Sequence, residues 1–166
     1  DLSDEVVVPA GEYAFVNMQA MIFTPSSKPL GAMFRLEAGE FYDGNILSLE
    51  ASPILNISSS LQLSGAYEFN AINFPERDQQ LRSHIARVNV LYMYSTKLSI
   101  STFVQLNNGN NAFIGNFRVR YNPREGNDFY LVYNEYRGFM VPSTIPEDPP
   151  YYSRAIILKY THTFRL

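Results

Sequence analysis

Hydrophobic and polar residues alternate along most of this chain. From Leu98 to Asn107 the even positions are mainly apolar and the odd positions mainly polar, and the segments 61–70 and 113–122 repeat the pattern. Strict alternation over roughly eight to ten residues is typical of a β-strand with one apolar and one solvated face. The pattern therefore predicts an all-β, antiparallel protein.

The alternation predicts nine strands, near 12–23, 30–41, 46–55, 60–70, 82–94, 97–107, 111–122, 127–136 and 154–166. Short polar connections are expected at 26–29, 56–59, 95–97 and 122–126. Longer or more irregular ones are expected at 42–45, 71–80, 107–110 and 137–153. Short turns that alternate with longer loops are typical of an up-and-down barrel in an outer membrane.

The composition indicates whether the apolar face is expected to meet lipid or to pack inside a soluble protein. The chain has 12 Tyr and 12 Phe but only 17% charged residues. Its polar positions are mostly Asn, Gln, Ser, Thr and Arg, whereas the surface of a soluble barrel is normally rich in Lys and Glu. Aromatic residues gather at strand ends, as in the girdles of membrane barrels. We predict an antiparallel up-and-down transmembrane β-barrel in the outer membrane of a Gram-negative bacterium. The alternative is a soluble lipocalin-like β-barrel that binds a small apolar ligand.

Length and charge exclude several other classes of protein. The 166 residues suit one domain, with 1–10 as an N-terminal extension or short strand and 11–166 as a barrel segment. A net charge of -3 argues against a nucleic-acid partner, and the absence of cysteine excludes disulfides and thiolate metal sites. No run approaches the roughly 18 apolar residues of a membrane helix.

The period of two assigns particular side chains to each side of the predicted barrel wall. A register slip of one residue would place arginines in hydrocarbon, at about 2–4 kcal/mol each near the bilayer midplane. The residues expected to face lipid are Val104, Leu106, Phe117, Val119, Leu158 and Tyr160. The residues expected to face the lumen are Arg87, Asn89, Gln105, Asn116, Arg118 and Arg120.

The C-terminal residues carry a further pattern. Apolar positions run to the last residue and include Tyr160, Phe164 and Leu166. This resembles the C-terminal signal read by the machinery that assembles outer-membrane barrels, although Leu166 stands where an aromatic ring is usual. The alternative is a terminal strand that merely ends in apolar residues.

Five segments carry a family resemblance: 11–44, 60–76, 94–108, 115–137 and 159–166. The most specific pieces are Gly39 to Gly44 and Tyr121 to Glu135. These segments resemble the C-terminal barrel region of an uncharacterised family of Bacteroidota outer-membrane proteins, in which a carbohydrate-binding-like module precedes the barrel. That module has no counterpart here, and the family offers no catalytic residues to carry over. The resemblance implies a membrane anchor, scaffold or channel component of a cell-surface assembly, glycan-related in view of the module. The expected partners are outer-membrane lipid, the assembly machinery, and other outer-membrane subunits or an N-terminal part of the same protein.

Candidate catalytic and metal-binding residues are few. His84 and His162 are the only histidines, too few for a histidine-rich metal site. A carboxylate pair could serve glycoside hydrolysis, but we expect the strand glutamates to form ion pairs across the lumen instead. These glutamates are Glu37, Glu40, Glu50 and Glu68, and the expected partners are Arg35, Arg87, Arg118 and Arg120. The proline-rich stretch from Pro142 to Pro150 is either a partner-binding segment or an ordered surface loop. No catalytic residue, metal or cofactor is predicted, and an enzyme is not expected.

The number of strands raises the question of closure. Single-chain bacterial barrels have an even number of strands with both ends in the periplasm, whereas nine strands with Leu166 in the periplasm would start outside the cell. Either Asp4 to Pro9 form a tenth strand, or earlier strands lie in residues missing from this sequence, as the resemblance to a C-terminal region favours. In both cases the first strand should not close directly onto the last.

Overall fold

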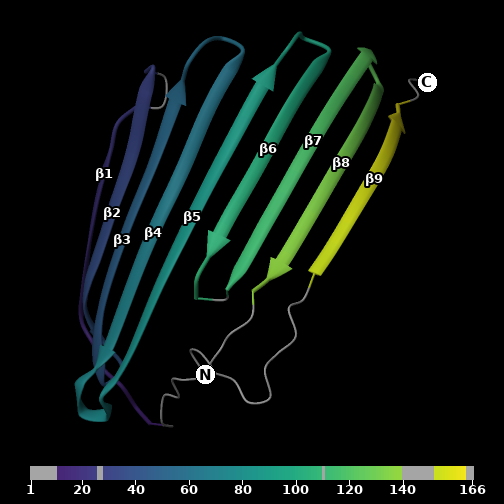
Figure 1. The fold of residues 1–166 in the computed structure, drawn as a ribbon. Coiled ribbons are helices and arrows are strands. Elements are labelled where there is room, and N and C mark those ends of the chain that lie inside the picture. The colour runs from purple at the N-terminus through teal and green to yellow at the C-terminus, as the bar shows by residue number, and fades with distance from the viewer. Residues whose placement is uncertain (1–10, 26–27, 110, 140–151, 164–166) are drawn as a thin grey trace.

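The described part of the chain forms an open antiparallel β-sheet of nine strands. A computed structural model describes residues 11–25, 28–109, 111–139 and 152–163. Within them the strands pair in chain order, each antiparallel to the next (Figure 1). They are β1 (Asn17–Phe23), β2 (Leu30–Phe41), β3 (Gly44–Asn56), β4 (Leu61–Phe74), β5 (Gln79–Met93), β6 (Leu98–Asn107), β7 (Ala112–Arg124), β8 (Asn127–Gly138) and β9 (Tyr152–His162). None of the described residues belongs to a helix long and apolar enough to cross a membrane.

The predicted all-β class and up-and-down strand order are confirmed, with differences at the strand ends. β1 begins at Asn17, later than the alternation predicts. The stretch 71–80, predicted as an irregular connection, mostly extends β4 and β5 and leaves only the short 3-10 turn η1 (Pro75–Arg77) between them. The extension continues the alternation, because Ile72 and Phe74 stand on one face and both are buried.

The predicted alternation of short and long connections is wrong for the described part of the chain. The connection 24–29, at the end expected to carry short turns, is longer than 42–43 at the opposite end. Phe41 pairs directly with Gly44, and Tyr42 adopts a left-handed φ of 52° that lets two residues reverse the chain. Loop length therefore does not indicate which end of the sheet would face the periplasm and which the outside of the cell.

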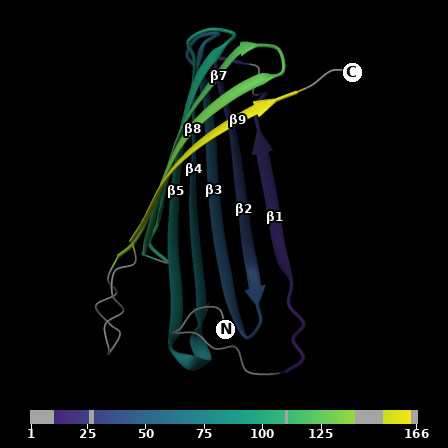
Figure 2. The same ribbon diagram turned by 90° about the vertical axis from the view of Figure 1, so that its right-hand side faces the viewer.

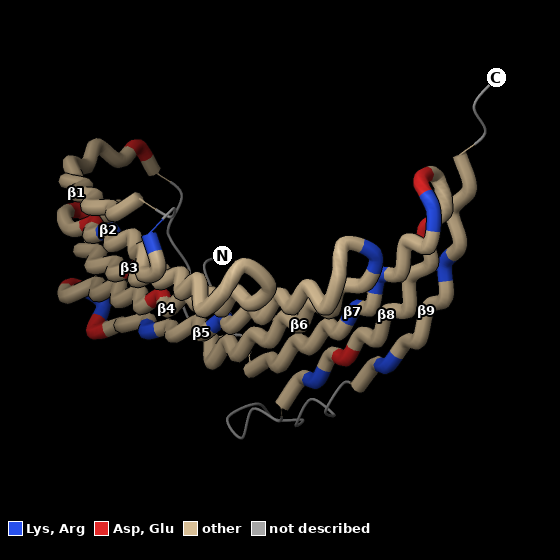
Figure 3. The backbone as a smooth tube through the Cα atoms, turned by 90° about the horizontal axis from the view of Figure 1, so that it is seen from above, with Lys and Arg blue, Asp and Glu red and all other residues tan. Residues whose placement is uncertain are grey.

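The sheet curls into a trough that is not closed. Seen along its strands, β1 and β9 rise at opposite rims (Figure 3), and the side view shows the same open side (Figure 2). In the described residues β1 pairs only with β2, and β9 only with β8. As expected from the sequence, the first strand does not close onto the last.

The polar positions of the strands point into the trough. The backbone N–H groups of Asn56, Met93 and Asn122 donate toward β2, β4 and β6 respectively. In a strand of L-residues the strand direction and the N–H direction together determine the face on which the side chain stands. These three residues therefore stand on the hollow side of the sheet (Figures 1 and 3). We call this side the concave face and the opposite side the convex face.

A small apolar cluster lies at one end of the concave face. Phe74 is fully buried and packs with Ile72 against the partly buried Phe41, Ile46 and Leu81. The Arg77 guanidinium lies 4.1 Å from the Phe74 ring centroid and donates to Asp43 Oδ1 at 2.7 Å. Among described residues the other buried hydrophobic side chain is Ala112. Because so few side chains are buried, this sheet does not have the interior of a soluble domain.

Gly44, beside this cluster, leaves no room for a side chain. A Cβ there would lie 2.3 Å from Asn73 O and 2.6 Å from Phe74 Cδ1. We expect Gly44→Ala to lower the free energy of unfolding by about 1–3 kcal/mol, since backbone and core ring must both move. Gly65→Ala is the control, because its Cβ would meet Arg87 O at 3.5 Å, an ordinary contact. Urea titration of both variants measures the difference, and equal stabilities would refute the packing argument.

Candidate functional site

The convex face gathers the residues predicted to face lipid. Strand register places Val104 between Val88 and Gly115, and places Val119, Leu131 and Leu158 in one row. Leu106, Phe117 and Tyr160 stand on the same face. The six side chains therefore share one surface, as the alternation predicts.

On several strands the apolar side chains of this face are more exposed than the polar neighbours on the other face. On β3, Leu47 and Leu49 are 39% and 43% exposed, whereas their neighbours Ser48 and Glu50 are half-buried. On β6, Leu106 is 50% exposed and its neighbour Gln105 is half-buried. A large contiguous apolar surface is rare on soluble monomers and marks contact with a partner or with lipid.

The convex face has charged residues at its two ends. In the described strands, Glu40, Arg82, Glu135, Arg137 and Arg154 lie near the end that carries the connections 42–43, 75–78 and 108–111. Arg124, which pairs with Asn127 after a bulge, is the last residue of β7 and lies at the opposite end. Between these two ends the face is an uncharged band in the described residues.

At the end that carries most of these charges, three charged residues and a tyrosine form one cluster. Glu135 accepts hydrogen bonds from Arg137 Nε at 2.7 Å and from Arg154 Nη2 at 3.4 Å. Both guanidinium groups also lie over the Tyr152 ring, at 5.2 and 4.4 Å from its centroid. The cluster combines paired charges with an aromatic ring, a combination suited to a boundary between an apolar layer and water.

Aromatic rings mark the opposite end of the apolar band. Tyr121, Phe129 and Tyr160 stack across β7, β8 and β9, with centroid separations of 6.4 and 4.6 Å. Tyr92 stands on the same face of β5, near the same end. The arrangement is that of an interfacial row, in which the ring lies in the apolar layer and the hydroxyl meets water.

The concave face gathers the residues predicted to face the lumen. Arg87 pairs in register with Gln105, Asn89 with Phe103 and Asn116 with Asn134, and Arg118 and Arg120 stand on the same face. Hydrogen bonds join neighbouring strands: Arg87 Nε donates to Gln105 Oε1 at 3.1 Å, and Ser48 Oγ donates to Asn70 Oδ1 at 2.6 Å. Asn116 also donates to Asn134. Several polar groups of this face therefore bond to one another across neighbouring strands.

The expected ion pairs across the lumen are replaced by pairs between adjacent strands. Arg35 lies 3.9 Å from Glu50, and Arg87 lies 3.4 Å from Glu68. Arg120 pairs with Asp128 at 2.8 Å instead of with a glutamate. The sheet is open, and side chains on neighbouring strands stand only about 5 Å apart at Cβ, so adjacent partners are the ones within reach.

The remaining glutamates and Arg118 do not form the expected pairs. Glu37 Oε1 accepts from Asn17 Nδ2 at 3.2 Å, and Glu40 Oε2 accepts from the Val16 N–H at 3.1 Å. Glu40 stands on the convex face, so its alternation phase should have separated it from the other three glutamates. Arg118 makes no ion pair with any residue that the structure describes.

Charges on the concave face are sorted by sign along the sheet. In the described strands β2 to β4 carry Arg35 with three carboxylates: Glu37, Glu50 and Glu68. Strands β5 to β9 carry one carboxylate, Asp128, with four cations: Arg87, Arg118, Arg120 and Lys159. One half of the trough is therefore acidic and the other basic, and they meet at the Glu68–Arg87 pair.

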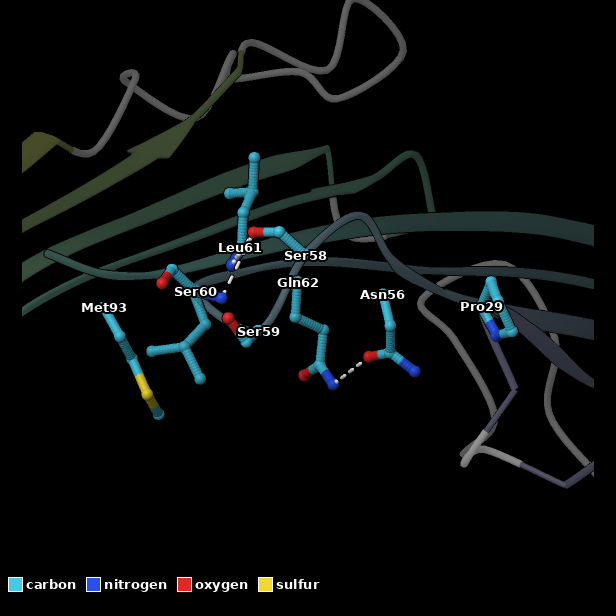
Figure 4. Close-up of a pocket in the computed structure, with 9 residues that line it drawn as sticks. Pro29, Asn56, Ser58, Ser59, Ser60, Leu61, Gln62 and Met93 are labelled. Atoms are coloured by element: carbon cyan, nitrogen blue, oxygen red, sulfur yellow. Dashed lines mark hydrogen bonds between the residues drawn. The ribbon is translucent and has the colours of Figure 1, made fainter.

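A shallow hollow lies at the rim of the concave face (Figure 4). It has a volume of about 450 Å³ and is lined by the 58–60 turn and the strand ends beside it, including Leu91 and Met93. Its polar groups already bond one another: Gln62 Nε2 donates to Asn56 Oδ1 at 2.8 Å, and Ser58 Oγ accepts from the Leu61 N–H at 3.1 Å. The lining carries no nucleophile beside a base, so the hollow gives no catalytic arrangement.

The histidines serve local contacts. His84 Nδ1 lies 2.7 Å from the Tyr67 hydroxyl, and His162 contacts Asn127. Within the part of the chain that the structure describes, no three histidine, aspartate or glutamate side chains gather as a metal site. Phe164 and Leu166 of the predicted assembly signal, the Pro142 to Pro150 stretch and Asp4 to Pro9 lie outside the described residues.

Sequence reasoning missed two carboxylates with several partners, Asp128 and Glu135. Asp128 accepts from Arg120 Nε and from Asn122 Nδ2, and Glu135 accepts from Tyr133, Arg137 and Arg154. A signal for Glu135 was available, because it stands in phase with Phe129, Leu131 and Tyr133. A charge in an apolar phase marks the end of the apolar band.

Comparison with known proteins yields no match to any family model, curated protein or solved structure. The family resemblance therefore stays a prediction.

Proposed function

We propose that this chain is the membrane-spanning wall of an integral outer-membrane β-barrel, which serves as an anchor, scaffold or channel component of a cell-surface assembly. The observation that carries the proposal is the uncharged apolar band on the convex face. In an aqueous monomer this band would leave side chains such as Ile156 and Leu158, 76% and 78% exposed, in contact with water. In a bilayer the same side chains would meet hydrocarbon, which removes that cost.

The strand dimensions support the proposal. A transmembrane strand tilted by about 45° needs roughly 9–11 residues, and eight of the nine strands here have 10 to 15. On β6 the apolar phase runs from Leu98 to Leu106. That is about 27 Å of strand, or roughly 20 Å of height at this tilt, close to the ~25 Å band of known barrels.

The geometry does not favour the lipocalin-like alternative. A soluble barrel that binds an apolar ligand needs its apolar face on the inside of the curve. Here the inside carries Arg87, Arg118 and Arg120 together with the amides around them, while Val104, Leu106, Phe117 and Val119 stand outside. The polar concave face instead suits a water-filled or plugged lumen. The narrower reading, a glycan-related surface assembly of the Bacteroidota family, is supported only by the sequence resemblance.

Single cysteines at adjacent positions test the proposal, because the natural chain has none. In vesicles, the thiol of Val104→Cys on the convex face should not react with a water-soluble maleimide. A fluorescent label on this cysteine should be quenched by a nitroxide lipid. Gln105→Cys on the concave face, the matched control, should react with the maleimide and escape quenching. Equal behaviour of the two cysteines, or a chain that stays monodisperse in buffer without detergent, would refute a membrane location.

A further inference from the structure

The two edges of the sheet run in the same direction. Each of the nine strands is antiparallel to the next, so β1 and β9 are parallel to one another (Figure 1). Direct closure of β1 onto β9 would therefore require a parallel pair. An antiparallel closure requires an odd number of further strands between them.

Particular backbone N–H groups of β9 and β1 point toward the open edges of the sheet. On β9 the Thr163 N–H donates to Gly126 O, so the N–H groups in phase with Thr163 point toward β8. The groups of Ile156, Leu158 and Tyr160 therefore point to the open edge, since directions alternate along a strand. On β1 the Thr24 N–H donates to Ala32 O, which leaves Gln19 and Met21 directed at the open edge.

We infer that the gap between β9 and β1 is filled by an odd number of β-strands from polypeptide beyond these 166 residues, as part of one longer chain. The inference rests on the proposed function, because an unpaired backbone group in hydrocarbon costs several kcal/mol. Nine strands plus an odd number give the even total of single-chain bacterial barrels. The possible tenth strand from Asp4 to Pro9 has only six residues, fewer than the roughly 9–11 that a transmembrane strand needs.

A second copy of the sheet does not satisfy these edges. A two-fold axis along the barrel would place β9 beside the β1 of the other copy, and the two strands would be parallel. A two-fold axis in the membrane plane would make β9 antiparallel to β9, but it would turn one copy upside down in the bilayer. Assembly from one side of the membrane gives both copies the same orientation, so neither arrangement yields an antiparallel closure.

The edges also define the side chains that the closing strands carry. The strand beside β9 faces Ile156, Leu158 and Tyr160 on the convex side, so its convex positions are apolar or aromatic. Its concave positions lie beside Ile157 and Lys159 and meet the lumen. The closing segment therefore has the same period of two as the strands described here.

The first test is the mass of the natural protein. The mature protein is isolated from the organism that makes it, with an antibody against residues 11–163, and its intact mass is measured. We expect a mass well above 19.0 kDa. A mature protein of 19.0 kDa would overturn the inference.

The second test is hydrogen exchange in detergent, with the natural protein beside the 166-residue chain. In the natural protein the amides of Ile156, Leu158 and Tyr160 should be as protected as those of Ile157 and Lys159. In the 166-residue chain only Ile157 and Lys159 should keep protection, at least tenfold slower in exchange than the edge-directed amides. Fast exchange of the edge-directed amides in the natural protein, or their protection in a dimer of the 166-residue chain, would refute the inference. The maleimide test of the convex face is independent of these results, so a failed closure and a failed membrane location are distinguishable.

Discussion

Arginine at position 88 should destabilise the lipid-inserted protein by about 2–4 kcal/mol, a change of roughly 30- to 700-fold in the ratio of folded to unfolded protein. Val88 lies in the middle of β5 on the convex face, between Gly65 and Val104, and is 47% exposed. In the proposed bilayer its side chain meets hydrocarbon, where a guanidinium loses its hydration. Urea titration of Val88→Arg in phospholipid vesicles measures the loss.

The adjacent position supplies the control for this experiment. Asn89 stands on the concave face, in register with Ser64 and Phe103, and is exposed. We expect Asn89→Arg to change the free energy of unfolding by no more than about 0.5 kcal/mol, as for other solvated surface positions. If Val88→Arg is equally harmless, the convex face meets water and the proposed function is wrong.

Truncation of Phe74 to alanine should lower the free energy of unfolding by about 3–5 kcal/mol. The ring is fully buried against Ile72 and also supports the Arg77 guanidinium, which is held by Asp43. Alanine would leave a cavity and remove the surface on which Arg77 rests. Thermal and urea unfolding of Phe74→Ala, monitored by tyrosine fluorescence, give the size of the effect.

A phenylalanine on the edge of the same sheet isolates burial as the cause. Phe23, at the end of β1, is 73% exposed. Phe23→Ala removes the same atoms without opening a cavity, and we expect a loss of no more than about 1 kcal/mol. Comparable losses at the two positions would mean that the Phe74 cluster contributes little to stability.

The sequence predicted the strands and their two faces because side chains alternate with a period of two. Val119 and Arg120 differ by one position, so once the strand is recognised their opposite faces follow. Connections lack such a rule. The sequence predicts a longer connection than the two-residue turn at 42–43. Tyr42 adopts a left-handed conformation in this turn, which a tyrosine rarely does, so the residue type gives no sign of a tight turn. The extension of β4 continues the alternation through Ile72 and Phe74, so this part of the strand is contained in the pattern, whereas the short turn η1 that follows is not.

The sequence predicts which residues belong to the candidate site, but it does not predict which of them pair with one another. The alternation predicts that Arg87 and Arg120 share one face, and they do, yet the partner of Arg120 is Asp128 rather than a glutamate. Register between strands determines which side chains meet, and register follows from turn geometry that the alternation alone leaves open. For the same reason the Glu135 cluster could be found only after β8 and β9 were aligned.

Acidic and basic residues lie on opposite halves of the concave face. A barrel interior formed by this face would therefore have an electric field across it, perpendicular to the barrel axis. A dipolar solute such as a zwitterion, moving along the trough, would turn its cationic end toward Glu37 and Glu50 and its anionic end toward Arg118 and Lys159. A solute with a net positive charge would instead move along the acidic wall, and a solute with a net negative charge along the basic wall. Selection in such an interior would depend on the distance between a solute's charges as well as on its size.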